Sequence, residues 1–279
     1  LSEGIMPHSS APDPDPAPGL VTIGRAAKKA TLGGRTQVIV PVSGDAAALS
    51  GQVEAMASCR ADIVEWRADT FLSSLVGSHF VAASDVEEDL VRMARYVADS
   101  SPLPVLATIR TSVEGGEAYL DDDEYCALVR RLASFAGGAD VEISRDGSSA
   151  LIEEAHEAGA IVVASFHDFE GTPGDEQLAE VLAAMNYAGA DVLKFACMAN
   201  SATDAARVLA AQAWAREAYD RPVIGISMGE HGAPTRLVGS ALGSAATFAT
   251  LPGWEGSAPG QFTVEQVRAV LDIVEASED

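Results

Sequence analysis

Basic residues are scarce in this sequence. Lys and Arg number 18 against 41 Asp and Glu among 279 residues, so the formal net charge is −23. A negative field of that size repels the phosphates of nucleic acids and of anionic membrane surfaces, so we expect neither as a partner. An anionic small-molecule substrate stays possible, because a few local Lys or Arg side chains can still bind one.

Cysteines and long apolar runs are also scarce. Cys59, Cys126 and Cys197 lie far apart, without CxxC or metal-ligand spacing, and predict reduced thiols rather than a disulfide or a metal site. No apolar run approaches the roughly 18 residues that span a membrane. The first residues also lack the basic and then apolar pattern of a signal peptide. We therefore expect a cytoplasmic protein without a bound metal.

Hydrophobic residues, by contrast, make up 48% of the chain, which is enough for a large buried core. Residues 1–19 contain a run in which Pro alternates with Asp and Ala, and they predict a flexible or extended Pro-rich tail. Residues 20–279 are expected to form a single domain. At its start, the strand-like segments 21–24 and 37–42 lie on either side of the turn signal Gly33-Gly34 and could form a β-hairpin.

From residue 38 onward, short runs rich in Val and Ile alternate with Ala-rich stretches whose apolar residues recur at helical spacing. This alternation favours a (β/α)8 barrel, the TIM-barrel fold, preceded by the hairpin. A doubly wound open sheet is the alternative, but no Gly-x-Gly-x-x-Gly follows the first strand. The expected strands are 38–42, 62–66, 104–109, 139–143, 161–166, 191–195, 223–227 and 237–241.

Charged residues stand where several of these strands end. The carboxyl ends of barrel strands form the rim at which active sites are built, and buried parallel strands otherwise consist of apolar residues. Glu65 and Arg67 are two positions apart and point the same way on a strand. They are either a mutual ion pair or a pair that binds substrate hydroxyls.

The next two strands carry a basic and an acidic cluster. Arg110 ends one strand and precedes Glu114, which is followed by two glycines that allow a tight backbone path. We expect Arg110 and Glu114 to share a polar site. Asp140 and Glu142 lie on one face of the following strand, where their expected role is to hold lysine or arginine side chains.

A histidine and a lysine mark the next two strand ends. His167 follows a buried strand and suits a general acid–base role, with a capping or core histidine as the alternative. Lys194 lies among Val, Leu and Phe inside strand 191–195. Burial disfavours the ammonium form, so a nucleophilic amine becomes available near neutral pH. The alternative is a structural ion pair of Lys194 with Glu142 or Glu65 across the barrel.

Two later segments complete the candidate site. Arg236 follows a glycine-bounded loop, and its guanidinium suits bidentate recognition of a carboxylate. Residues 256–261, Gly-Ser-Ala-Pro-Gly-Gln, have the composition of a lid that closes over a ligand. A simple surface connection would have the same composition.

These segments resemble the motifs of the type I 3-dehydroquinate dehydratases, the Schiff-base enzymes of the shikimate pathway. The resemblance covers roughly residues 36–275. Pro41 and Asn200 depart from it, where some members have Ser and Gln. The matching segments are 65–69, 108–110, 114–117, 165–169, 189–194, 227–229, 236, 243–248 and 257–261.

The resemblance implies a TIM barrel, a homodimer, and neither metal nor cofactor. It implies that Lys194 forms an imine with the substrate, that His167 transfers protons, and that Glu114 orients His167. Asp140 and Glu142 would belong to the polar network inside the barrel. The substrate-binding residues that it implies are Glu65, Arg67, Arg110, Arg236, Ser257, Gln261, Met228 and Phe248.

The implied reaction is the syn elimination of water from 3-dehydroquinate to give 3-dehydroshikimate, on the route to chorismate and the aromatic amino acids. A class I aldolase or transaldolase, which also forms a lysine imine in a barrel, is the enzymatic alternative. An acidic barrel that acts only as a binding or regulatory partner is the non-enzymatic one.

Overall fold

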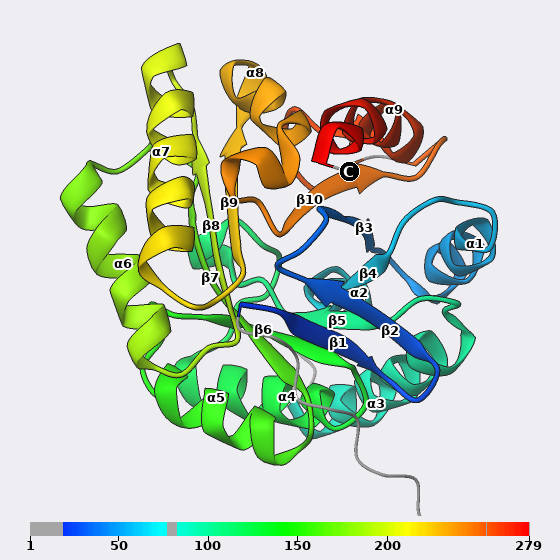
Figure 1. Cartoon of the computed structure of the whole chain (residues 1–279). Helices are drawn as coiled ribbons and strands as arrows, with labels where there is room; N and C mark the ends of the chain where they lie inside the picture. Colours follow the sequence, from blue (N-terminus) through cyan, green and yellow to red (C-terminus); the bar gives the residue numbers. More distant parts are fainter. Residues whose placement is uncertain (1–18, 77–82, 255, 279) are drawn as a thin grey trace, which may run out of the picture.

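The computed structural model describes residues 19–76, 83–254 and 256–278. Eight parallel strands form the centre of this described part, and helices surround them (Figure 1). The strands are β3 (Gln37–Val42), β4 (Ile63–Arg67), β5 (Val105–Thr108), β6 (Gly138–Glu142), β7 (Ile161–Asp168), β8 (Val192–Met198), β9 (Val223–Met228) and β10 (Ala246–Thr250).

The sheet of these strands closes on itself. β3 pairs with β10 and with β4, and each later strand pairs with the next through β9. The Ala245 N–H donates to the Val223 carbonyl at 2.8 Å, and a parallel bridge joins Val223 to Ser244, so β9 also meets the β10 segment. The predicted (β/α)8 barrel is therefore confirmed.

Helices connect the strands and cover the outside of the barrel. Their apolar faces pack on the outward side chains of the sheet in one large core. The α-helices are α1 (Ala46–Met56), α2 (Ala68–Val76), α3 (Ala83–Ser100), α4 (Asp122–Ala133), α5 (Ser148–Glu157), α6 (Asp175–Tyr187), α7 (Ala202–Ala218), α8 (Gly229–Gly232) and α9 (Val264–Val274). The 3-10 helices are η1 (Ser112–Glu114), η2 (Ala233–Leu237), η3 (Gly239–Leu242) and η4 (Glu275–Glu278).

An antiparallel hairpin precedes the barrel, but its second strand is not the one expected. β1 (Val21–Arg25) pairs with β2 (Lys28–Leu32), whereas residues 37–42 are the first barrel strand, β3. The turn is Ala26-Ala27, with Ala26 in the left-handed region at φ 51°. An alanine in that conformation is uncommon, and no Asn-Gly or Asp-Gly pair marks the turn, so the sequence pattern did not reveal it.

The hairpin closes the amino-terminal end of the barrel. Ile23 and Leu32 pack in one core cluster with side chains from inside the barrel. The Arg25 guanidinium donates to the carbonyls of Ala133, Ala136 and Ala158, at 2.8, 2.8 and 3.0 Å. These carbonyls lie at the carboxyl ends of α4 and α5, where a cation is favourable.

The expected strand 237–241 is wrong. These residues lie in η2 and η3, and the eighth barrel strand is β10, with a two-residue strand β11 (Phe262–Thr263) paired beyond it. Gly239 has φ 59°, a conformation incompatible with a strand. The β10 sequence, Ala-Thr-Phe-Ala-Thr, has the β-branched and aromatic residues that strands favour.

The predicted Pro-rich tail 1–19 lies outside the described residues except for Gly19, so it stays a prediction, as does the single domain over 20–279. The three cysteines are free thiols, and only Cys197 is fully buried. No described helix is long and apolar enough to cross a membrane.

Candidate active site

Alternation along the strands divides the barrel interior into an apolar and a polar half. Side chains two positions apart on a strand point to the same face, and on four strands an inward polar residue follows an inward apolar residue two positions earlier. The apolar members pack together with the hairpin. The pairs are Ile63 and Glu65, Leu106 and Thr108, Val163 and Ser165, and Val192 and Lys194.

The Lys194 side chain is buried in the polar half and surrounded by acceptors. Its Nζ lies 3.0 Å from Asp140 Oδ2 and 3.5 Å from Glu65 Oε1. The Phe248 ring covers the same nitrogen, with its centroid at 4.9 Å. Of the two carboxylates expected to pair with Lys194, Glu65 lies beside its nitrogen. Glu142 contacts other residues instead, and Asp140 is the second carboxylate beside Lys194.

Arg110 holds the acidic residues of this half together. Its guanidinium donates to Asp140 at 2.7 Å, to Glu142 at 3.1 Å and to Glu114 at 3.2 Å. It also donates to Ser165 Oγ at 3.0 Å. One buried guanidinium thus faces three carboxylates, which leaves a local excess of negative charge.

The excess charge and burial act on Glu114. Burial raises the pKa of this carboxyl, and Arg110 opposes the rise while Glu142 adds to it, so that the pKa reaches about 7. The Ser144 hydroxyl donates to Glu114 Oε1 at 2.8 Å. Glu114 follows β5 in η1, and Gly115, at φ 78°, ends that helix in a left-handed conformation suited to glycine.

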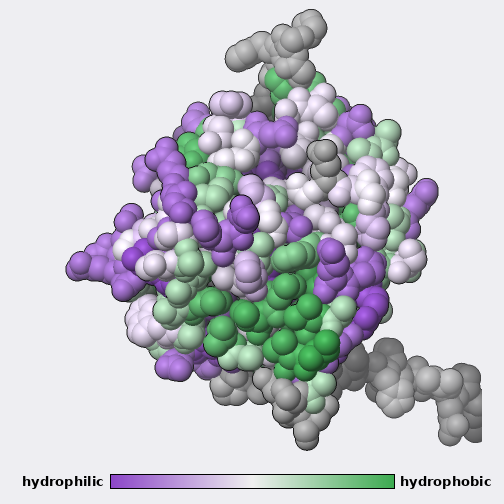
Figure 2. All heavy atoms as spheres, turned by 90° about the horizontal axis from the view of Figure 1, so that it is seen from above, coloured by the Kyte–Doolittle hydropathy of each residue, from purple (hydrophilic) through white to green (hydrophobic). Residues whose placement is uncertain are grey.

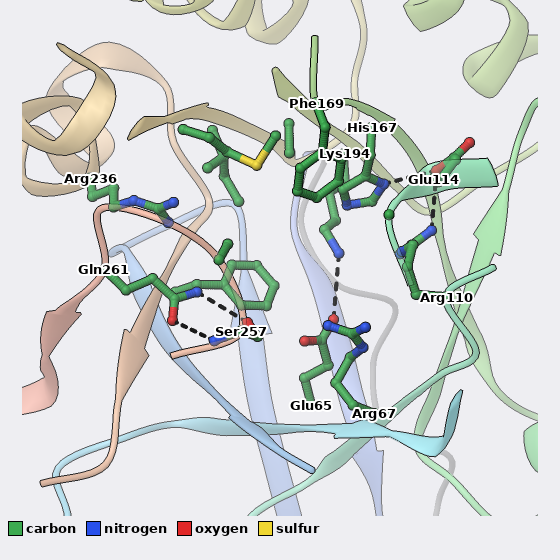
Figure 3. Close-up of a pocket in the computed structure, with 16 residues that line it drawn as sticks. Glu65, Arg67, Arg110, Glu114, His167, Phe169, Lys194, Arg236, Ser257 and Gln261 are labelled. Atoms are coloured by element: carbon green, nitrogen blue, oxygen red, sulfur yellow. Dashed lines mark hydrogen bonds and ion pairs between the residues drawn. The ribbon is translucent and has the colours of Figure 1, made fainter. Parts of the chain in front are cut away.

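His167 contacts Glu114 directly. Its Nδ1 lies 2.9 Å from Glu114 Oε2. A dashed line marks this contact in Figure 3. Burial lowers the pKa of the imidazole well below its usual range, and the positive charges of Arg110 and Lys194 lower it further. The imidazole is therefore neutral. With Nδ1 held by the carboxylate, Nε2 is the ring nitrogen that can exchange protons with a ligand.

Glu65 and Arg67 do not form the mutual ion pair considered from the sequence. Arg67 instead makes a two-point contact with Asp69, at 2.8 and 2.6 Å. Glu65 accepts from the Thr108 hydroxyl at 3.1 Å and lies near Lys194. Both side chains line the pocket, so the second interpretation, binding of hydroxyls, is the one that the geometry allows.

Arg236 lies across the pocket from Glu114 (Figure 3). It sits in η2 rather than on a strand, and its Nη2 donates to the Pro259 carbonyl at 3.1 Å. Its Nε is buried and has no hydrogen-bond partner among the described residues, and burial lowers the pKa of the guanidinium to about 10. An unpaired buried cation of this kind calls for an anionic ligand.

The lid candidate reaches the same pocket. Gln261 Oε1 accepts from the Ser257 backbone N–H at 3.0 Å, and its Nε2 donates to Ser257 Oγ at 3.1 Å. These bonds, together with the Arg236 contact to Pro259, fix the segment over the pocket.

All eleven residues proposed for the site from the sequence line this one pocket. Five further residues line it. Sequence reasoning gave Gly115 only a role in the backbone path after Glu114 and gave the other four no role, although Phe169 and Ala258 lie in segments that match the family. The expectation that Asp140 and Glu142 hold lysine or arginine side chains is confirmed, but Asp140 was not named as the nearest partner of Lys194. The additional lining residues are Gly115, Phe169, Ala196, Ile226 and Ala258.

A buried lysine amine, a neutral imidazole and an unpaired arginine in the mouth of a parallel barrel define a class of enzyme that forms an imine with a keto acid. A family model, "Type I 3-dehydroquinase", matches residues 38–278. The chain therefore belongs to the type I 3-dehydroquinase family.

Relatives and solved structures agree with this assignment. The chain is 36% identical to the 3-dehydroquinate dehydratase of Klebsiella pneumoniae (strain 342) over 247 residues, covering 86% of this chain and 94% of that protein. The crystal structure of the Geobacillus kaustophilus HTA426 3-dehydroquinate dehydratase is similar with a TM-score of 0.83 at 30% identity, covering 94% and 98% of the two chains. The crystal structure of a Clostridium difficile type I enzyme with covalently modified comenic acid is similar with a TM-score of 0.79 at 29% identity. The match covers 92% of this chain and 98% of that chain.

Proposed function

We propose that this protein dehydrates 3-dehydroquinate to 3-dehydroshikimate by syn elimination through an imine on Lys194. The observation that carries the proposal is the buried Lys194 amine beside a neutral His167, in one pocket at the carboxyl end of the barrel. Membership of the type I 3-dehydroquinase family favours dehydration over the carbon–carbon cleavage of aldolases.

The imine solves the main chemical difficulty of the reaction. A carbanion next to a neutral ketone is unstable, whereas an iminium at that carbon accepts the electron pair readily. The Lys194 ammonium releases a proton, the amine attacks the C3 carbonyl, and loss of water with return of one proton gives the iminium. His167 Nε2 then removes the C2 proton, and the electrons of that bond form the enamine. Because the lysine supplies the electron sink, the reaction needs no cofactor or metal.

The same imidazole completes the elimination. His167, now protonated, donates its proton to the C1 hydroxyl, which leaves as water while the enamine returns to a conjugated iminium. A single group can serve both steps when proton and hydroxyl leave from the same face of the ring. Hydrolysis of the iminium releases the product and restores Lys194. Glu114 keeps the Nδ1 proton in place and so leaves Nε2 free to act as the base.

The rest of the pocket suits a polyhydroxylated carboxylate. Arg236 is the carboxylate partner, because its buried Nε has no acceptor in the part of the chain that the structure describes. Ser257 and Gln261 close over that end. Glu65 and Arg67 face the ring hydroxyls, and Arg110 acts on the same end mainly through the carboxylates it holds. Met228 and Phe248 form apolar walls.

The protein is also proposed to be a cytoplasmic homodimer. Figure 2 shows a cluster of apolar side chains exposed on one face, a feature typical of a surface that another chain covers. Leu242 on η3 and Ile273 on α9 are among the large apolar side chains that remain exposed, and these two elements are in contact. Light scattering in solution tests the dimer, and a single-chain mass would contradict it.

The activity is tested by trapping and by absorbance. Addition of 3-dehydroquinate should generate the ultraviolet absorbance of a conjugated enone, and borohydride should leave a reduced adduct on Lys194 detectable by mass spectrometry. Lys194→Met is the control that should give neither. His167→Ala should still give the adduct while turnover collapses. Folded native protein without enone or adduct would contradict the proposal.

A further inference from the structure

Asp140 is the carboxylate nearest to the proposed reactive nitrogen. It lies on β6 with no exposed surface, and its Oδ2 accepts from Lys194 Nζ at 3.0 Å. Its other oxygen, Oδ1, accepts from Arg110 Nη2 at 2.7 Å and from Ser165 Oγ at 2.6 Å. Asp140 is not among the residues that line the pocket, so a substrate does not compete for these contacts.

The three donors keep this carboxyl ionised. The charges of Arg110 and Lys194 and the hydrogen bonds of Ser165 and Lys194 outweigh burial and lower the pKa of Asp140 to about 2. Glu65, the other carboxylate near Lys194, is farther away at 3.5 Å and does line the pocket. Asp140 is therefore the fixed negative charge beneath the amine.

The charge beside Asp140 is the same before and after imine formation. The lysine ammonium and the ketone give the iminium and one water, so two of the three ammonium protons leave in the water and one remains on nitrogen. The nitrogen carries one positive charge in both states. An Asp140 oxygen that accepts from the ammonium is equally placed to accept the remaining N–H of the iminium.

We propose that Asp140 is the counter-ion of the Lys194 iminium, and that it keeps the imine nitrogen protonated at neutral pH so that this nitrogen can accept the electrons of the C2–H bond. The inference rests on the proposed function and adds a residue to it. Without the carboxylate, the buried iminium would lose its proton more readily, because burial disfavours a lone charge. A neutral imine is a far weaker electron sink.

Other charged groups also act on this nitrogen, and the test has to separate them from Asp140. Glu142 contacts Arg110 and Thr111 but not Lys194, so it is a matched carboxylate of the same network. The ionisable groups that interact with Lys194 or Asp140 from the neighbouring strands, helices and loops are Glu65, Arg110, Glu114, Tyr125 and His167.

The experiment measures how fast cyanoborohydride reduces the imine that Lys194 forms with 3-dehydroshikimate, as a function of pH. This reagent reduces the protonated iminium, so the midpoint of the profile reports loss of the N–H proton. In Asp140→Asn the midpoint should fall by about one to three pH units, the effect of one nearby opposite charge. Glu142→Gln should keep the native midpoint, and Asp140→Glu should restore most of it.

An unchanged midpoint in Asp140→Asn, or an equal fall in Glu142→Gln, would overturn the counter-ion role. A native protein that forms no adduct would instead overturn the proposed function, so the two failures are distinct. Should Asp140→Asn not fold, the native protein labelled with 15N-lysine gives the same information. Its imine nitrogen should keep the chemical shift of a protonated iminium across the neutral range, and a shift that titrates there would contradict the proposal.

Discussion

Replacement of Glu114 by glutamine should stabilise the protein at alkaline pH while it impairs turnover. The ionised Glu114 carboxylate is buried, with 3% of its surface exposed, in a network where one Arg110 guanidinium faces three carboxylates. Its pKa rises from 4.5 to about 7 on folding, mainly through burial. The folded state therefore binds this proton more tightly than the unfolded state does.

The magnitude follows from that difference. A rise of the pKa from 4.5 to about 7 corresponds to about 3 kcal/mol. Because the folded-state pKa is raised, the stability that protonation supplies is fully present below 4.5 and is lost as the pH rises to about 7. Glutamine stays neutral at every pH, so Glu114→Gln should not lose this stability as the pH rises. Its weaker hydrogen bonds to Arg110 and His167 should offset part of that gain.

Urea unfolding of both proteins at about pH 5 and about pH 8 provides the assay, since these values bracket the titration. From about pH 5 to about pH 8, the free energy of unfolding should fall by up to about 3 kcal/mol more in the native protein than in Glu114→Gln. Glu117→Gln, which removes an exposed carboxylate from the same loop, is the control and should behave as the native protein does. Identical pH dependence in the native protein and Glu114→Gln would refute the reasoning.

Turnover should respond in the opposite sense. Native kcat/KM should rise with pH through about 7, because only ionised Glu114 holds the proton on His167 Nδ1 and leaves Nε2 as the base. In Glu114→Gln this rise of kcat/KM with pH should disappear. The rate at higher pH should fall about 100-fold, the lower end of what general acid–base catalysis contributes, since the amide oxygen can still accept from Nδ1.

Three further predictions concern other parts of the molecule. Arg236→Met should lower kcat/KM by an amount equivalent to about 2–5 kcal/mol, mainly through KM in steady-state assays, because the substrate carboxylate loses its buried partner. Gly115→Ala should cost about 1–3 kcal/mol in denaturant unfolding and also reduce turnover, because its Cβ would lie 2.4 Å from the Phe169 ring at φ 78°. Arg25→Met should cost about 2 kcal/mol in the same unfolding assay, because it frees three carbonyls. Unchanged values for any of these three variants would contradict the corresponding contact.

The barrel and the pocket were predictable because short sequence patterns within the individual strands indicate both. Runs of Val and Ile give the strands, and a polar residue at the carboxyl end of each run gives the rim. Lys194 and His167 are conspicuous for that reason, since each interrupts an apolar segment. The loop before Arg236 and the composition of residues 256–261 already indicated a carboxylate site and a lid, and the family motifs then supplied the individual roles of Ser257 and Gln261.

Features that depend on tertiary partners were not predictable. The partner of Lys194 was expected to be Glu65 or Glu142. Strand pairing aligns Glu142 through Ser165 with Lys194, but Arg110 and Thr111 bind Glu142, and Asp140 is the carboxylate that contacts Nζ. The eighth strand was misplaced because residues 237–241 begin with apolar residues, and only the backbone at Gly239 shows that they cannot be extended. The hairpin partner was missed because its alanine turn carries no sequence signal.

The hairpin also determines how the protein can be attached to a surface. β1 and β2 cover the amino-terminal end of the barrel, whereas the pocket opens at the carboxyl ends of the strands. A fusion partner or resin joined ahead of β1 would thus be anchored on the side facing away from the mouth, with Arg25 bound to two helix ends as part of the anchor. Immobilisation by that end should leave diffusion of small molecules into the pocket unobstructed.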